Sequence, residues 1–262
     1  MVDTNLTDKV AVVTGASKGI GLATTQALVA AGAHVVAGAR HTSSDLDALV
    51  AAGSATFVPA DLATADGPKT LIAAAAERGG IDILVNNTGA VTPRFDGLLS
   101  VSDDDWMASI AVNFLSAVRA TREAIPHMLT RGGGSIVMIG SVNATLPEWN
   151  IVDYSATKAA LANFAKSVSK EFGHNGIRVN TISPGPVATD LWLADHGVAA
   201  QFAAASGASP DEVVESAVAG SATGRFTTAG EVADLAVFLA GDRAANITGS
   251  DLRIDGGYVS TV

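Results

Sequence analysis

The chain alternates between short apolar runs and longer segments with helical periodicity. The short runs are rich in Val and Ile and are bounded by polar residues or glycine, which is typical of buried strands. In the longer segments, apolar residues recur every three or four positions, as on one face of a helix. Strands alternating with helices indicate an α/β fold, with a parallel sheet covered on both faces. The pattern predicts strands at residues 9–14, 34–40, 55–60, 81–86, 133–140, 177–182 and 250–254, and helices following the glycines near residue 21, from 64, from 102, around 154–168 and over 231–240.

Composition narrows the class of protein. Hydrophobic residues make up 48% of the chain and charged residues 16%, enough apolar surface for one large core without a linker. The net charge of −10 argues against binding to nucleic acid or to an anionic membrane. The absence of cysteine excludes disulfides, thiolate metal sites and cysteine catalysis, and the histidines are too scattered for a metal cluster. We find no secretory signal or membrane-spanning run, and expect a soluble, cytoplasmic protein.

A glycine-rich loop directly follows the first predicted strand. Gly15, Gly19 and Gly21 have the spacing G-x-x-x-G-x-G, and a helical pattern begins just after them. Glycine lets the backbone approach a ligand closely, and the free N–H groups of a helix N-terminus favour a pyrophosphate. The loop therefore predicts a dinucleotide site, although an ordinary tight turn could have the same composition.

The end of the second predicted strand bears on which dinucleotide is bound. In dinucleotide-binding folds, an acid there holds the adenosine ribose, whereas a basic residue accommodates a 2′-phosphate. This chain has Ala39 followed by Arg40, and Lys18 lies in the glycine loop. Because a guanidinium can bind a phosphate through two hydrogen bonds, we expect NADP(H) in preference to NAD(H). In the alternative, Arg40 is a solvated loop residue.

Polar residues also follow other predicted strands. Asp61 comes after the third, Asn87 after the fourth and Ser141 after the fifth. Ligands of open α/β sheets bind outside the carboxyl ends of the strands, so these side chains are candidates for one site. Asp61 could instead cap the helix predicted from Thr64. Asn113 lies inside a predicted helix, where it is either solvated or buried with a hydrogen-bond partner.

Tyr154 and Lys158 are the strongest candidates for chemistry. They are four residues apart in a helical pattern, which places them on one face, one turn apart. A neighbouring ammonium favours the phenolate and would lower the pKa of the tyrosine towards working pH, as a general acid or base requires. Taken alone, such a pair is more often a solvated helix face.

Together these features resemble the short-chain dehydrogenase/reductase family, in its single-domain branch, and are similar to 3-oxoacyl-(acyl carrier protein) reductase-like enzymes. The resemblance covers nearly the whole chain. It implies a Rossmann-type doubly wound parallel sheet of about seven strands with helices on both faces, in a single domain over residues 1–262 with a substrate-loop insertion at about 188–226. It rests on Thr14-Gly-x-x-x-Gly-Ile-Gly21, Asn86-Asn-x-Gly89, Asn113, Ser141, Tyr154-x-x-x-Lys158, Pro184-Gly185 and Asp255-Gly-Gly257.

The resemblance also implies roles for four catalytic residues. Tyr154 is the general acid or base, Ser141 donates a hydrogen bond to the substrate oxygen, and Lys158 lowers the Tyr154 pKa and binds the nicotinamide ribose. Asn113 holds a water that joins Lys158 to solvent. The implied cofactor contacts are Gly15, Ser17, Lys18, Gly19, Ile20, Gly21, Arg40, Asp61, Leu62, Asn87, Gly89, Tyr154, Lys158, Pro184, Gly185, Val187 and Thr189. Residues flanking the catalytic pair and the insertion give a candidate substrate pocket of Asn143, Leu146, Trp149, Pro186, Leu191 and Trp192, and no metal is expected.

The expected function is hydride transfer between NADP(H) and a ketone or secondary alcohol. The alternatives are an NAD(H)-dependent alcohol dehydrogenase of the same family and a non-catalytic dinucleotide-sensing protein. Thr88 stands where the family most often has alanine. The apolar residues of the candidate pocket favour an apolar ketone as the substrate. The sequence leaves the identity of this ketone open. The family resemblance also implies a homotetramer or homodimer.

Overall fold

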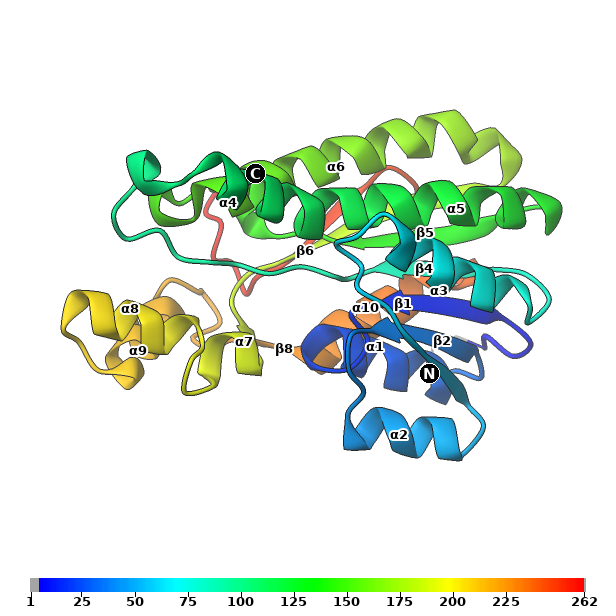
Figure 1. The fold of residues 1–262 in the computed structure, drawn as a ribbon, viewed down its shortest axis with the longest axis horizontal. Coiled ribbons are helices and arrows are strands. Elements are labelled where there is room, and N and C mark those ends of the chain that lie inside the picture. Colours follow the sequence, from blue (N-terminus) through cyan, green and yellow to red (C-terminus); the bar gives the residue numbers. More distant parts are fainter. Residues whose placement is uncertain (1–4, 262) are drawn as a thin grey trace.

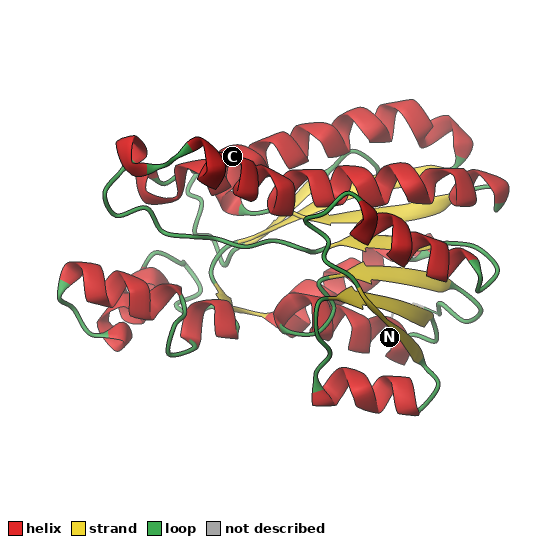
Figure 2. Cartoon of the chain, viewed as in Figure 1, coloured by secondary structure: helices red, strands yellow, loops and turns green. Residues whose placement is uncertain are grey.

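A seven-stranded parallel sheet forms the centre of the molecule (Figures 1 and 2). The computed structural model describes residues 5–261. The strand order is β3-β2-β1-β4-β5-β6-β9, and all the pairings are parallel. From β1 to β3 the chain adds strands towards one edge of the sheet, and from β4 onwards it adds them towards the other edge. This confirms the predicted doubly wound α/β fold in a single domain. The strands are β1 (Val10–Thr14), β2 (His34–Ala39), β3 (Ala55–Pro59), β4 (Ile83–Asn86), β5 (Gly134–Ile139), β6 (Ile177–Pro184) and β9 (Asp251–Ile254).

Helices cover both faces of this sheet (Figure 1). One apolar cluster joins the sheet to α3, α5 and α6, and a second joins it to α1, α2 and α10. Alternate residues of one strand enter different clusters: Val12 packs in the first, and Ala11 and Val13 pack in the second. The helices that flank the sheet are α1 (Gly19–Ala30), α2 (Ser44–Ala51), α3 (Asp66–Ala76), α4 (Asp103–Ile110), α5 (Ser116–Thr130), α6 (Val152–Phe172) and α10 (Ala229–Ala240).

The segment before α10 is more ordered than its sequence pattern suggested. Three helices occupy it: α7 (Asp190–Leu193), α8 (Val198–Ser206) and α9 (Pro210–Ala219). Just outside the two ends of this segment, the two-residue strands β7 (Val187–Ala188) and β8 (Thr227–Thr228) pair in parallel. The hydrophobic pattern of α9 is weak because none of its residues is buried. A reciprocal cap between Ser209 and Glu212 nevertheless marks its start.

No helix within residues 5–261 is both long and apolar enough to cross a bilayer.

Candidate active site

Four neighbouring strands place the predicted residues along one edge of the sheet. The glycine loop follows β1, Arg40 follows β2, Asn87 follows β4 and Ser141 follows β5. Because the strands are parallel, their carboxyl ends lie at the same edge. The fold therefore gathers residues that are far apart in the sequence.

The glycine loop is shaped so that side chains cannot enter it. Gly15 and Gly19 have φ angles of +68° and +54°. A Cβ on Gly21 would lie 2.1 Å from the carbonyl oxygen of Gly15. No side chain caps the N-terminus of α1, so its first N–H groups point towards the loop without a protein cap. This cradle fits the pyrophosphate of a dinucleotide.

Asn87 supports the loop from the neighbouring strand. Its Nδ2 donates to the carbonyl oxygens of Thr14 and Gly15, at 3.0 and 3.1 Å. In return, Thr14 Oγ1 accepts from the backbone N–H groups of Asn87 and Thr88, at 2.9 and 3.0 Å. The side-chain N–H groups of Asn87 thus hold the loop in shape. Nothing in the sequence indicated separately that the Thr14 hydroxyl would support the loop in this way.

Thr88 brings a buried hydroxyl to the same loop. A Cβ on Gly15 would lie 3.2 Å from Thr88 Oγ1. Within the described residues this oxygen has no hydrogen-bond partner. A buried hydroxyl without a partner beside the glycine loop fits a site for a polar ligand.

The other candidate cofactor residues differ in their surroundings. Lys18 and Arg40 are exposed, and neither is ion-paired among residues 5–261. Thr189 faces the glycine loop, since a Cβ on Gly19 would lie 3.6 Å from its Cγ2 atom. Ser17 and Ile20 are partly exposed, Leu62, Pro184 and Val187 are buried, and Gly185 packs against Asp255.

Two expectations near the third strand were wrong. The helix predicted from Thr64 begins at Asp66, and Asp61 does not cap it. Instead, Asp61 Oδ1 accepts from the N–H of Ala63 at 3.0 Å, which tightens the turn after β3. The exposed carboxylate of Asp61 remains at the sheet edge.

The three principal candidates for chemistry meet between β5 and α6. Lys158 Nζ lies 5.6 Å from the centroid of the Tyr154 ring, as the spacing of four residues predicts. Ser141 is hydrogen-bonded to Tyr154. The Ser141 hydroxyl also donates to Asn143 Oδ1 at 3.1 Å, and Lys158 Nζ donates to the carbonyl oxygen of Ile139 at 2.8 Å.

Burial controls the protonation of this group. It raises the pKa of the Tyr154 phenol, and the hydrogen bond between Tyr154 and Ser141 opposes that rise. Burial also lowers the pKa of Lys158 to about 8. In the chain alone, burial and the contact with Ser141 set the direction of the Tyr154 pKa, and the lowering by Lys158 that the family resemblance implies stays a prediction.

Asn113 lies within a π-helical turn, Ala111–Leu115, between α4 and α5. It is buried rather than solvated: its Oδ1 accepts from the N–H of Ala90 at 2.9 Å, and its Nδ2 donates to Ser109 at 3.3 Å. A Cβ on Gly89 would lie 3.1 Å from Asn113 Oδ1 and 3.4 Å from Lys158 Nζ. The lack of a side chain at Gly89 therefore lets the asparagine and the lysine approach each other.

Arg94 was missed in the sequence, although it holds the start of the catalytic helix. The guanidinium of Arg94 pairs with Asp153 and with Asp105, each at 2.9 Å. The backbone N–H of Arg94 donates to the carbonyl oxygen of Asn150 at 2.6 Å. Asp153 immediately precedes Tyr154 and is 3% exposed. Asp153, an acid next to the candidate catalytic tyrosine, was the sequence feature that could have indicated an ion pair here. Local spacing could not identify Arg94 as its partner, because the two residues lie far apart in the chain.

The candidate substrate residues divide into two groups. Asn143 contacts Ser141, and Leu146, Trp149 and Leu191 are exposed. Trp192 packs edge-on against Phe226, with ring centroids 5.3 Å apart, and Pro186 is buried. The contact between Trp192 and Phe226 therefore joins the beginning and the end of the insertion.

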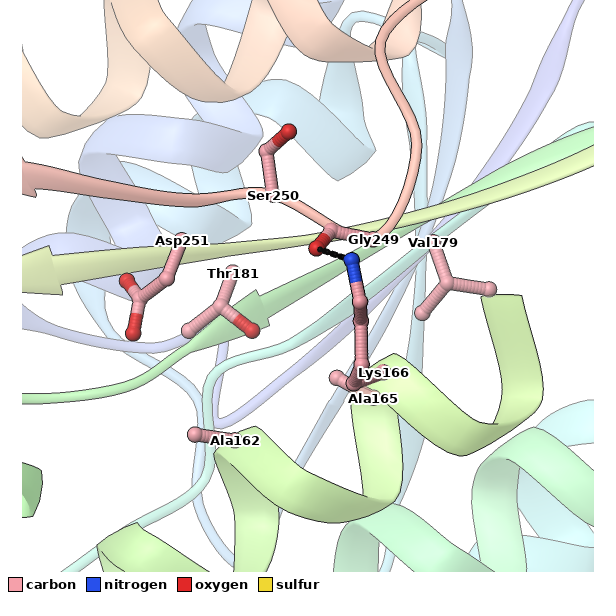
Figure 3. Close-up of a pocket in the computed structure, with 8 residues that line it drawn as sticks. All are labelled: Ala162, Ala165, Lys166, Val179, Thr181, Gly249, Ser250 and Asp251. Carbon is pink, nitrogen blue, oxygen red and sulfur yellow. Dashed lines mark hydrogen bonds between the residues drawn. The ribbon is translucent and has the colours of Figure 1, made fainter. Parts of the chain in front are cut away.

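A separate small pocket lies between α6, β6 and the edge strand β9 (Figure 3). Its volume is about 210 Å³, and Lys166 Nζ crosses it to donate to the carbonyl oxygen of Gly249 at 2.8 Å. None of the predicted site residues lines it.

Comparison with known proteins adds to this geometry. The profile of the short chain dehydrogenase family matches residues 9–196. The chain belongs to this family. It is 35% identical to the D-beta-hydroxybutyrate dehydrogenase of Rhizobium meliloti (strain 1021), over 96% of this chain and 99% of that protein. It is 34% identical to a 3-oxoacyl-(acyl-carrier-protein) reductase of Escherichia coli (strain K12), over 97% and 98% of the two chains.

Solved structures give the same classification. The L-sorbose reductase of Gluconobacter frateurii, complexed with NADPH and L-sorbose, superposes with a TM-score of 0.91. The two chains are 32% identical, and the match covers 100% of each. This short-chain dehydrogenase is therefore an oxidoreductase of a family that acts on CH–OH and C=O groups and binds a nicotinamide dinucleotide.

Proposed function

We propose that the protein transfers a hydride between NADP(H) and a ketone or secondary alcohol, with Tyr154 as general acid or base. The observation that carries this proposal is the meeting of Tyr154, Ser141 and Lys158 beside the glycine loop. Hydride addition to a carbonyl carbon builds negative charge on the oxygen. Two hydroxyls at that position would stabilise the charge, and one of them would supply the proton.

The chain offers groups for each part of the cofactor. The loop from Gly15 to Gly21 would hold the pyrophosphate, Arg40 and Lys18 the 2′-phosphate, and Lys158 the nicotinamide ribose. When bound, the cofactor supplies or accepts the hydride. Its oxidised ring is cationic, and a nearby positive charge favours the phenolate of Tyr154, opposing the effect of burial. Lys158 and Asn113, which approach each other at Gly89, would pass the proton on towards solvent.

Replacing Tyr154 by Phe tests the proposal. This change removes the proton donor while keeping the ring, so kcat should fall about 10²–10⁴-fold. The Kd for NADPH, followed by the fluorescence of the bound cofactor, should change little. The substrate panel should include hydroxy acids, 3-oxoacyl thioesters and sugars, as the names of the relatives suggest, together with apolar ketones. Unchanged turnover in Tyr154→Phe would refute the role of this residue.

The preference for NADP(H) is tested separately by Arg40→Ala. Losing a guanidinium contact to the 2′-phosphate should raise the KM for NADPH by about tenfold, equivalent to about 1.4 kcal/mol. The KM for NADH should stay within a factor of about two, since NADH lacks that phosphate. Equal changes for the two cofactors would favour the NAD(H)-dependent alternative.

We also propose that the protein self-associates as a homotetramer or homodimer. Leu98, Leu99 and Met107, at the start of the α4–α5 region, are 58%, 100% and 59% exposed. Neighbouring apolar side chains left in water favour burial by a partner. Sedimentation velocity should give a particle mass that is a multiple of the 26.3 kDa chain mass. Leu99→Asp should lower the measured particle mass. A monomer at micromolar concentration would contradict the proposal.

A further inference from the structure

Four segments outside the glycine loop follow or connect the elements that carry the proposed active site. They are residues 89–101 after β4, 142–153 between Ser141 and Tyr154, the insertion 189–226, and the C-terminal residues 255–261. They contact one another in three dimensions. The Phe95 and Phe202 rings meet edge-on with centroids 5.1 Å apart, which joins the first segment to α8. A Cβ on Gly220 would lie 2.7 Å from the Tyr258 ring, which joins the last segment to the end of α9.

Positive charge is scarce in these four segments. They contain two cationic residues of the Lys or Arg type, Arg94 and Arg225. Arg94 is bound to Asp105 and Asp153, and Arg225 is bound to Glu231 through two contacts of 2.9 and 2.6 Å. Both guanidinium groups are therefore committed to partners within the protein.

Negative charge is abundant in the same segments. Several carboxylates there take part in no ion pair among residues 5–261: Asp96, Glu148, Asp190, Asp195, Asp211 and Glu215. The cofactor side differs, because Lys18 and Arg40 are exposed there without an ion-pair partner in that part of the chain. The exposed cations without an ion pair thus lie in the glycine loop and after β2, whereas the carboxylates without an ion pair lie in the four segments.

Glu148 is the one of these six carboxylates that lies between Ser141 and Tyr154 in the chain. It is exposed on the short segment that connects Ser141 to Tyr154, next to the exposed Trp149. It also lies close to the C-terminal segment: burial raises the pKa of the Tyr258 phenol, and the charge of Glu148 raises it further. Glu148 therefore stands where the catalytic segment and the C-terminal segment meet.

We propose that the site accepts uncharged ketones and alcohols and rejects substrates that carry a carboxylate or phosphate near the reacting carbon, with Glu148 contributing to the rejection. This inference rests on the proposed function. An anionic substrate needs a cation to replace its lost hydration. Here it would meet like charges and no uncommitted guanidinium or ammonium apart from Lys158, which the proposed mechanism assigns to the ribose.

A matched pair of probes tests this proposal. Acetoacetate and acetoacetamide have nearly the same shape and differ in charge, and each is reduced at the same ketone. With NADPH at pH 8, kcat/KM should be at least about tenfold higher for the amide at low salt. Because screening weakens repulsion between exposed charges, the ratio should fall in 0.5 M NaCl.

Variants assign the effect to Glu148. Glu148→Gln should lower the ratio of kcat/KM for acetoacetamide to kcat/KM for acetoacetate about threefold, as expected for removing one partly hydrated charge. Glu171→Gln, an exposed acid near the far end of α6, is the matched control and should leave the ratio unchanged. A wild-type preference for acetoacetate, or equal values for both probes, would overturn the proposal. A ratio unaffected by Glu148→Gln would overturn the role of this residue.

Binding separates this inference from the proposed function. Calorimetric titration of both probes into the NADP⁺-loaded protein measures the same ratio without turnover. If neither probe nor any ketone of the panel is reduced, the proposed function fails, and tighter binding of the amide still supports uncharged selectivity. Equal binding, tighter binding of the acid, or no binding of either probe counts against it.

Discussion

The glycine loop and the insertion at 189–226 are built on different principles. The loop is fixed by backbone geometry: Gly21 touches the carbonyl of Gly15, and Asn87 and Thr14 lock the turn with hydrogen bonds. In the insertion, Trp192 contacts Phe226 within the segment itself, Phe202 contacts Phe95 outside it, and α9 buries no residue. The half that we assign to the cofactor is thus rigid, whereas the half assigned to the substrate can vary without disturbing the sheet.

The largest expected effect comes from disturbing the rigid half. In Gly21→Ala the new Cβ would overlap the carbonyl oxygen of Gly15, so α1 must move away from the loop. The Kd for NADPH should rise by about 10³-fold, or roughly 4 kcal/mol. Gly173→Ala is the matched control, since nothing lies within 4 Å of its added Cβ. Fluorescence titration should show unchanged binding in the control. Normal binding by Gly21→Ala would mean that the loop does not hold the cofactor.

Arg94 holds the start of the catalytic helix, and its loss should be nearly as severe. Arg94→Met would leave the buried Asp153 carboxylate without its partner, which typically costs about 3–5 kcal/mol. Urea unfolding should show this loss, and kcat should fall because the first turn of α6 carries Tyr154.

The double variant Arg94→Met/Asp153→Asn should recover much of the stability, because no unpaired charge remains buried. Arg122→Met, whose side chain is 70% exposed, is the control and should be nearly neutral. If Arg94→Met and the control unfold at the same urea concentration, the pairing does not support the helix.

Lys158 should make stability depend on pH. Its folded pKa of about 8 lies below the ordinary lysine value of 10.5, so the unfolded chain binds the proton more tightly between these values. Stability should therefore rise as pH increases above 8, by about 2 kcal/mol up to pH 9.5. The raised pKa of Tyr154 acts only above pH 10, outside this window. Urea unfolding of Lys158→Met should lose most of the rise; an identical pH dependence in this variant would contradict the assignment.

The smallest effect is expected in the adaptable half. Phe202→Ala removes the ring contact with Phe95, and such pairs contribute about 0.5–1.5 kcal/mol. The KM for the ketone should rise about fivefold, with kcat and NADPH binding nearly unchanged, if the contact positions α8 over the substrate. Steady-state kinetics should show no change for Glu171→Ala, an exposed position near the far end of α6. A fall in NADPH affinity in Phe202→Ala would show that the two halves are not independent.

The same contrast explains what could be predicted from the sequence. Strands such as Val10–Thr14 are buried on both faces, so their apolar runs predicted the sheet, and the spacing from Tyr154 to Lys158 predicted a shared helix face. The pairing of Arg94 with Asp153 depends on a contact between residues 59 positions apart. The π-helical turn at Asn113 follows from packing, and the exposed helix α9 lacks an apolar stripe. Tertiary contacts decide these features, and local periodicity does not encode them.

The central claim is that the cofactor gives its hydride directly to a substrate carbon beside Tyr154 and Ser141. It is tested by reducing a ketone from the panel with NADPH deuterated at both C4 positions, in ordinary water, and analysing the alcohol by mass spectrometry. One deuterium on the carbinol carbon is predicted in every product molecule, and the product should be absent or greatly reduced with Tyr154→Phe. Alcohol formed without deuterium would contradict the account.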